Sequence, residues 1–163
     1  MWPFTSKQPV EIKQPTGTSD NELRALSFLA PEIVQSLGRL PSEAIYGFMN
    51  GEDFSFDAFR PNPIFLNFMH RAIKEFGPRD PSLQAAAARQ REGWVYVIDL
   101  RTPDGPQGRV PIEDIVGGFE AKDGRLTSDA YWANEKHLVF SENGLVVLPP
   151  HINSALITAL MKC

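Results

Sequence analysis

Hydrophobic residues in the first 93 positions recur at helical spacing, in segments that proline and glycine separate. The first segment, Leu23–Leu37, follows a capping box at Ser19–Glu22 and is interrupted at Pro31. Three further segments place proline just inside their start and glycine just past their end, which is the order typical of helices. They run from Pro41 to Gly51, from Pro63 to Gly77 and from Pro81 to Gly93. The pattern therefore predicts a mainly helical layer over residues 20–92.

The hydrophobic period changes from 3.6 to 2 after residue 93. Trp94–Leu100 is β-branched and aromatic on both faces, which is typical of a central strand. A second strand over Ile115–Ala121 would return over Arg125–Thr127, because Asp123-Gly124 suits the positive φ angles of a type I′ turn. The sequence thus predicts the start of an antiparallel sheet.

A second hairpin and a closing helix follow. Asn143-Gly144 favours the same turn type, and a two-residue loop there would pair Phe140 with Val147. Together the hairpins predict four or five strands over residues 94–148. Apolar residues after the proline pair then form one stripe, which predicts an amphipathic helix over residues 151–162.

This order of elements predicts an α+β fold. We expect an N-terminal helical layer packed with an antiparallel, hairpin-rich sheet and a C-terminal amphipathic helix. Residues 1–18 combine prolines with a polar, aperiodic pattern, which predicts a flexible or draped arm. Residues 19–163 have the length of a single domain, and no internal repeat or heptad is expected in them.

Charge and cysteine content narrow the possible partners and compartment. The 16 Lys and Arg residues against 20 Asp and Glu give a net charge of −4, and neither half of the chain is basic. Nonspecific binding of nucleic acid therefore lacks its usual driving force. No apolar run is long enough for a signal peptide or a membrane span. With a single cysteine, Cys163, the expected compartment is the cytoplasm.

The sequence contains no established catalytic or metal-binding motif. The three histidines have no partner at i+3 or i+4 and no Cys-x-x-Cys occurs, so we expect no metal or cofactor. No nucleophile elbow is present, and we assign no catalytic residue. An alternative is a small enzyme or ligand-binding domain with a polar cleft between helices and sheet. Its plausible polar groups are Asp99, Glu113 and His137.

The segment from Ser42 to Ala58 is the strongest binding candidate, because it contains four acids, several aromatics and no lysine or arginine. Aromatic anchors with complementary charge are typical of protein interfaces. The competing interpretation places the aromatics in the core and the acids in solvent. The candidate binding residues are Glu43, Glu52, Asp53, Phe54, Phe56 and Asp57, together with Tyr131 and Trp132 in a later loop.

These features favour a cytoplasmic protein-binding module, an inhibitor or immunity-type protein that occludes a toxin or enzyme. Its partner would be a protein with a basic surface. In general character the chain is similar to small cytoplasmic immunity proteins that bacteria keep beside secreted toxins, being acidic, α+β and without a catalytic motif. The likeness rests on that character and carries no family residues over.

Overall fold

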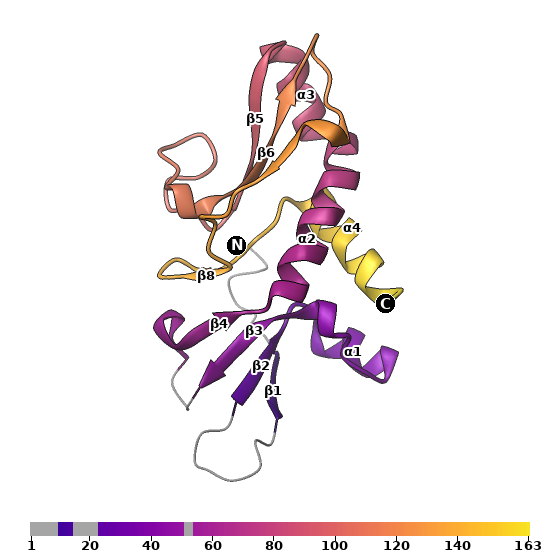
Figure 1. Ribbon diagram of the computed structural model, residues 1–163, viewed down its shortest axis with the longest axis vertical. Helices are drawn as coiled ribbons and strands as arrows, with labels where there is room; N and C mark the ends of the chain where they lie inside the picture. The colour runs from indigo at the N-terminus through magenta and orange to yellow at the C-terminus, as the bar shows by residue number, and fades with distance from the viewer. Residues whose placement is uncertain (1–9, 15–22, 51–53) are drawn as a thin grey trace. The chain divides into compact units, whose positions relative to one another are not determined.

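The computed structural model describes residues 10–14, 23–50 and 54–163 (Figure 1). Its α-helices are α1 (Pro31–Leu37), α2 (Pro63–Phe76), α3 (Pro81–Gln90) and α4 (Pro150–Met161). Its strands are β1 (Val10–Gln14), β2 (Leu23–Ser27), β3 (Ile45–Asn50), β4 (Phe59–Pro61), β5 (Gly93–Ile98), β6 (Ile115–Ala121), β7 (Tyr131–Ala133), β8 (Phe140–Ser141) and β9 (Gly144–Leu145). The α+β class and the C-terminal helix are confirmed.

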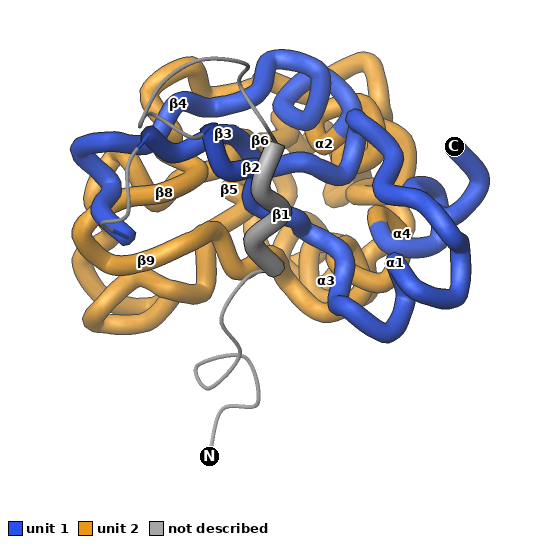
Figure 2. Tube along the Cα trace, turned by 90° about the horizontal axis from the view of Figure 1, so that it is seen from below, with its two compact units in different colours: residues 1–68, 157–163 blue, residues 69–156 orange. Residues whose placement is uncertain are grey.

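The chain divides into two compact units, which are described separately (Figure 2). Unit 1 comprises residues 1–68 and 157–163, and its antiparallel sheet has the order β1-β2-β3-β4. Unit 2 comprises residues 69–156 and contains the antiparallel sheet β5-β6-β7 and the small hairpin β8-β9. In unit 2, α3 lies beside β5 (Figure 1).

The prediction of a mainly helical N-terminal layer is wrong over residues 23–27 and 45–50, which form β2 and β3. Most residues of both strands are buried, so the strands have apolar side chains on both faces. Such a run has no period of 2 and cannot be told from a buried helix by periodicity. The first helix begins only at Pro31. The capping box at Ser19–Glu22 lies outside the described residues, whereas residues 10–14 of the expected arm form β1.

The prediction that Trp94–Leu100 is a central strand is also wrong. β5 is at one end of the described order of its sheet and β6 is the central strand. Val97 is fully buried, whereas Trp94 and Tyr96 are 40% and 45% exposed. The strand therefore alternates between an inner and an outer face, as expected for a strand with one face in solvent.

Two hairpin details differ from the predictions. The turn at Asp123-Gly124 has the expected positive φ angles of 52° and 75°, and Arg125 pairs with Lys122 across it. The pairing ends there, so the strand that continues the sheet is β7 and not Arg125–Thr127. In the second hairpin Phe140 pairs with Leu145 and not with Val147, since the loop is shifted by one residue. The helices predicted after Pro63 and Pro81 and over residues 151–162 are confirmed.

The two units share a structural repeat, so the expectation that the chain has no internal repeat is wrong. In unit 1, β2 is followed by α1, a 3-10 helix, β3, a second 3-10 helix and β4. In unit 2, β5, β6 and β7 are separated by 3-10 helices in the same way, with the loop of residues 99–111 in the place of α1. The β2–β3 register shifts after Leu26, and the β5–β6 register shifts after Val97. The second residue after each shift makes an equivalent backbone hydrogen bond. The Phe28 N–H donates to the Ala44 carbonyl oxygen at 2.7 Å, and the Asp99 N–H donates to the Asp114 carbonyl oxygen at 2.8 Å.

One asparagine closes each repeat in the same way. The Asn62 side-chain amide donates to the carbonyl oxygens of Ser42 and Ile45, both at 3.0 Å. The Asn134 amide donates to the equivalent oxygens of Ile112 and Ile115 at 2.9 and 2.7 Å. The asparagine thus ties the end of the third strand to the 3-10 turn before the second.

A faint sequence signal accompanies the repeat. Pro-x-Glu-x-Ile-x-Gly occurs at residues 41–47 and again at 111–117, and Asp-Ala-aromatic-x-x-Asn occurs at 57–62 and 129–134. The glycines are required by close strand approach, because a Cβ at Gly47 or Gly117 would collide with the carbonyl oxygen of Arg60 or Trp132. The copies were missed because residues 41–51 were predicted as helix and 115–121 as strand.

We predict that Asn62→Asp and Asn134→Asp destabilise the protein to a similar extent. A carboxylate cannot donate to the two carbonyls, and each buried group left unpaired costs about 1–3 kcal/mol. Urea unfolding followed by circular dichroism measures the loss. The exposed Asn67→Asp serves as the control. Equal stability of Asn134→Asp and Asn67→Asp would contradict this account of the repeat.

Candidate functional site

A buried polar network centred on Arg101 lies in unit 2. The Arg101 Nε atom is 2.9 Å from Asp114 Oδ1 and 3.2 Å from Asp99 Oδ2, and these side chains are at most 3% exposed. The two terminal guanidinium nitrogens donate to four backbone carbonyls. These belong to Glu113, Leu138, Val139 and Gly144. All five N–H donors of the guanidinium are therefore used.

Asp99 extends this network in two further directions. Its Oδ2 atom is 3.0 Å from His137 Nε2, and both side chains are buried. Its Oδ1 atom accepts hydrogen bonds from the backbone N–H groups of Arg101 at 3.1 Å and Val147 at 2.9 Å. One carboxylate thus joins the end of β5 to a histidine and to the segment that precedes α4.

The repeat shows that the shared fold does not require this network. The unit 1 residues at the positions of Asp99 and His137 are Phe28 and Phe65, whose ring centroids are 5.6 Å apart. Asp114 is likewise replaced by Ala44. An apolar cluster therefore fills in unit 1 the place that charged side chains fill in unit 2.

An additional segment in unit 2 explains the difference. In unit 1, α2 begins directly after Asn62, whereas residues 135–149 lie between Asn134 and α4. This segment contains only the two-residue strands β8 and β9, so few of its carbonyls can pair in a ladder. Arg101 supplies donors to three of them, and Asp99 accepts from Val147. The network thus satisfies the backbone of a segment that has little regular structure.

The chemistry of this network is structural rather than reactive. Among the described residues, Asp114 Oδ2 and His137 Nδ1 are buried without a hydrogen-bond partner. Both atoms are closed to solvent, so a substrate cannot reach them in this conformation. Asp99 and His137, expected in a polar cleft, do meet but are buried, and Glu113 contributes its backbone carbonyl. Sequence reasoning missed Arg101, since a single arginine in a loop has no distinguishing pattern.

A second polar pair is His70 on α2 and Tyr131 on β7. The Nδ1 atom of His70 is 2.7 Å from the Tyr131 hydroxyl oxygen. Burial, and secondarily the nearby His137, lower the pKa of His70 to about 4, and burial raises the pKa of Tyr131. At neutral pH the Tyr131 hydroxyl therefore donates to an uncharged imidazole.

Three exposed aromatic side chains lie on the outer face of the sheet β5-β6-β7. Tyr96 on β5 is opposite Gly118 on β6, which in turn is opposite Trp132 on β7. Trp132 is 41% exposed, and its ring packs edge to face against Trp94 with centroids 6.2 Å apart. We call Trp94, Tyr96 and Trp132 the aromatic face.

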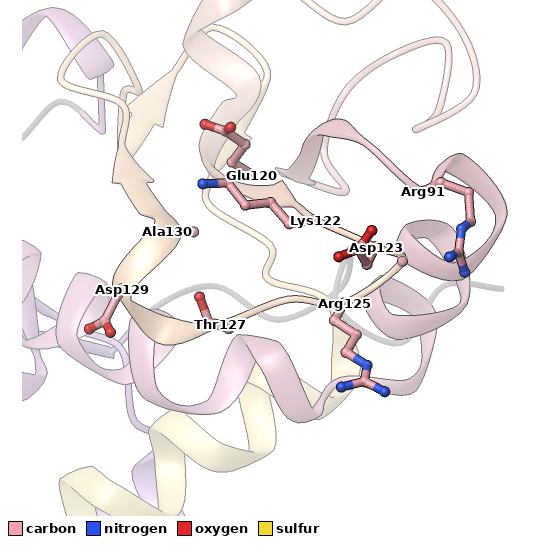
Figure 3. Close-up of a pocket in the computed structure, with 9 residues that line it drawn as sticks. Arg91, Glu120, Lys122, Asp123, Arg125, Thr127, Asp129 and Ala130 are labelled. Atoms are coloured by element: carbon pink, nitrogen blue, oxygen red, sulfur yellow. The ribbon is translucent and has the colours of Figure 1, made fainter.

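A pocket of about 910 Å³ adjoins the end of β6 and includes residues of the following turn (Figure 3). Figure 3 shows Glu120 and Lys122 projecting to the same side of the chain. The charged lining of the pocket comprises three cations, Arg91, Lys122 and Arg125, and three anions, Glu120, Asp123 and Asp129. The turn is fixed to the end of α3, because Gly124 donates to the Arg91 carbonyl at 2.9 Å. The balanced charge gives the pocket no preference for an anion or a cation.

The predicted binding residues differ in their exposure to solvent. Phe54 and Phe56 are each 41% exposed, and Asp57 is exposed, whereas Glu43 is half-buried. Glu52 and Asp53 lie outside the described residues. Glu43 and Asp57 recur as Glu113 and Asp129 in the second repeat, so these two acids belong to the shared pattern of the units. Trp132 faces outward, whereas Tyr131 faces inward and packs on Phe119 with ring centroids 4.9 Å apart.

The described ranges contain no group of three or more His, Cys, Asp or Glu side chains that could hold a metal ion. Within the same residues, every helix is too short or too polar to cross a membrane. No family model, curated protein or solved structure matches the chain. The fold and the site together define an α+β protein with two copies of a three-stranded repeat, one in each unit. The copy in unit 2 has a buried charged network and an exposed aromatic face.

Replacing Arg101 with methionine should destabilise the protein by about 3–5 kcal/mol, because it leaves two carboxylates buried without their cation. Urea unfolding measures the change. Arg109→Met, at an exposed position in the same loop, is the matched control and should change stability by less than about 0.5 kcal/mol. A similar small effect at both positions would show that the network does not hold unit 2 together.

The His70–Tyr131 pair predicts a specific loss of stability in acid. Because the folded pKa is lowered from 6.5 to about 4, the unfolded chain takes up the proton first. The contribution is complete above pH 6.5 and declines as the pH falls toward 4. We expect wild type to lose about 2 kcal/mol relative to His70→Gln over that range.

The comparison with His70→Gln cancels the titration of other groups, and the glutamine amide oxygen can still accept from Tyr131. Urea unfolding at pH 7.0, 5.5 and 4.5 gives the difference, and NMR titration of the imidazole gives the pKa. A difference that is constant across these pH values, with an imidazole midpoint near 6.5, would refute the assignment.

Proposed function

We propose that the chain is a protein-binding module, and more specifically a cytoplasmic inhibitor or immunity-type protein that occludes a toxin or enzyme. The aromatic face is the observation that carries the proposal. Large aromatic side chains are enriched at the centre of protein interfaces, where they supply most of the binding free energy. Three of them lie together here at 40–45% exposure.

Gly118 supports this interpretation, because it lets the Tyr96 and Trp94 rings lie close over β6. A Cβ at this position would lie 3.1 Å from Tyr96 Cδ1 and 3.4 Å from Trp94 Cε3. The repeat register places Phe48 at the equivalent position of unit 1, with Ala25 and Arg60 on the flanking strands. The aromatic concentration on the outer face is therefore a property of unit 2 and not of the shared fold.

The area of the aromatic face is smaller than that of a complete protein interface. An aromatic side chain buries about 150–250 Å², so three rings at this exposure offer roughly 200–300 Å². A stable interface needs about 800 Å² on each partner. The aromatic face is thus large enough for the central anchor of an interface, and the partner must also contact its surroundings. Exposed Glu120, opposite Trp94 on β6, is the nearest acid for a basic partner.

A small ligand-binding domain is the second candidate function, and the pocket at the end of β6 is the observation that favours it. Its charged lining suits a polar ligand with groups of both signs. The Asp99–His137 pair does not contribute to this alternative, because it is buried within the Arg101 network.

Trp132→Ala is predicted to weaken partner binding at least tenfold, because it removes a large exposed ring that packs against Trp94 in the aromatic face. A photo-reactive amino acid at the exposed position 122, on the same side of the chain as Glu120, would first capture the partner and leave the aromatic face intact. Mass spectrometry then identifies the partner, and expression supplies it in pure form. Calorimetry then measures the affinity.

Phe56→Ala and the double variant Glu52→Lys, Asp53→Lys test the acidic segment in the same assay. A basic partner that meets this segment would associate more slowly with the double variant, with a weaker salt dependence. Met161→Ala, at an exposed position on α4, is the control and should bind as wild type does. Full affinity in Trp132→Ala would remove the aromatic face as the binding site.

A further inference from the structure

The outer edge of β5 has no partner strand among the described elements, whereas the equivalent edge in unit 1 is filled. The order of the unit 1 sheet is β1-β2-β3-β4, and that of the unit 2 sheet is β5-β6-β7. Since β2, β3 and β4 correspond to β5, β6 and β7, unit 2 lacks a counterpart of β1. The repeat therefore defines a strand position that is occupied once and open once.

The backbone of β5 shows where this edge is available. The Gln90 side-chain amide donates to the Trp94 carbonyl oxygen at 2.9 Å from outside the β5–β6 ladder. The Trp94 carbonyl thus points away from β6, and so do the backbone groups of Tyr96, two residues further on. Within the described part of the chain, no other backbone or side chain bonds to the Tyr96 backbone from that side.

The residues of β5 themselves have none of the side-chain protections that are usual at an edge strand. Natural edges are blunted by proline, by charged side chains or by a covering element. The residues from Trp94 to Ile98 include no proline and no charged side chain, and the Tyr96 side chain is 45% exposed. Gln90 covers one carbonyl and leaves the edge around Tyr96 accessible.

Unit 1 supplies the geometry of strand addition. β1 pairs with β2 in antiparallel orientation, with Ile12 opposite Ala25. The β2–β3 and β5–β6 registers make Ala25 equivalent to Tyr96. A strand added to unit 2 in the same way would run antiparallel to β5 and would be centred opposite Tyr96.

We propose that the outer edge of β5 binds an extended segment of the partner protein as a fourth strand, in the place that β1 has in unit 1. This inference rests on the proposed protein-binding function and names the binding element of the partner. Backbone hydrogen bonds would hold the segment, and alternate apolar side chains would lie beside Trp94 and Tyr96 on the outer face. The aromatic face and the edge then form one continuous site.

A partner strand fits this edge better than a second copy of β5 does. Two β5 strands paired about Tyr96 would bring the Trp94 carbonyl of each copy into the ladder, where Gln90 already occupies it. A foreign segment can end before Trp94 and leave that hydrogen bond intact.

A random peptide display library, selected on the full chain, provides the probe. The tightest peptide is labelled, and fluorescence anisotropy measures its affinity for three proteins. Wild type is compared with Tyr96→Ala, which loses the ring but keeps the backbone N–H, and with Tyr96→Pro, which loses both. Proline is tolerated on an edge strand where its missing N–H faces outward, and circular dichroism checks the fold.

Strand addition predicts that Tyr96→Pro binds the peptide at least tenfold more weakly than Tyr96→Ala. Methylating the peptide backbone nitrogens one at a time should abolish binding at alternate positions only, which tests the ladder without altering the protein. Equal affinities of the two variants, or insensitivity to methylation, would overturn the proposal. A library that yields no peptide dependent on this edge would do the same.

Two further outcomes show whether the strand-addition proposal or the protein-binding function is at fault. If wild type sediments as a dimer and Tyr96→Pro as a monomer, the edge binds a second copy and the partner strand is excluded. If the photo-captured partner loses affinity for Trp132→Ala but binds Tyr96→Pro and Tyr96→Ala equally, strand addition fails while the protein-binding function stands.

Discussion

The buried guanidinium of Arg101 is the constraint on which unit 2 depends. A cation removed from water is tolerated only when its charge and all of its donors are matched, and Asp99, Asp114 and four carbonyls do so here. Those carbonyls come from positions that are distant in the sequence, so one side chain joins the end of β5, the turn before β6 and the segment before α4. The aromatic face is built on the sheet that this junction holds.

Comparison of the units separates what the fold requires from what one copy has acquired. Both units need the closing asparagine, which donates to two backbone carbonyls, and the glycine that lets the second and third strands approach closely. The interior beside them is free to vary, since phenylalanines fill it in unit 1 and a charged network fills it in unit 2. The same backbone therefore accepts different interiors, and the charged interior of unit 2 holds the additional segment before α4.

The elements that sequence reasoning predicted correctly are those with local signals. Pro63 and Asp80 mark the starts of α2 and α3, and Asp123-Gly124 fixes a turn through its positive φ angles. The sequence pattern of β2 and β3 resembles that of a helix, because a strand that is buried on both faces has no alternation of polar and apolar residues. The Arg101 network depends on contacts between residues far apart in the chain. The duplication has a sequence signal in two short repeated patterns, Pro-x-Glu-x-Ile-x-Gly and Asp-Ala-aromatic-x-x-Asn.

The positions at which the two units differ also bear on how the chain folds. Tandem copies of one backbone plan risk exchanging strands during folding, because each strand finds a near-equivalent place in the wrong sheet. Side-chain size discourages that exchange here. If β3 entered the sheet of unit 2, Phe48 would take the position of Gly118. Even a Cβ atom at that position would lie only 3.1 Å from Tyr96 Cδ1. The clash would strain the misassembled sheet, so the glycine at position 118 also helps each strand to pair with its own neighbours.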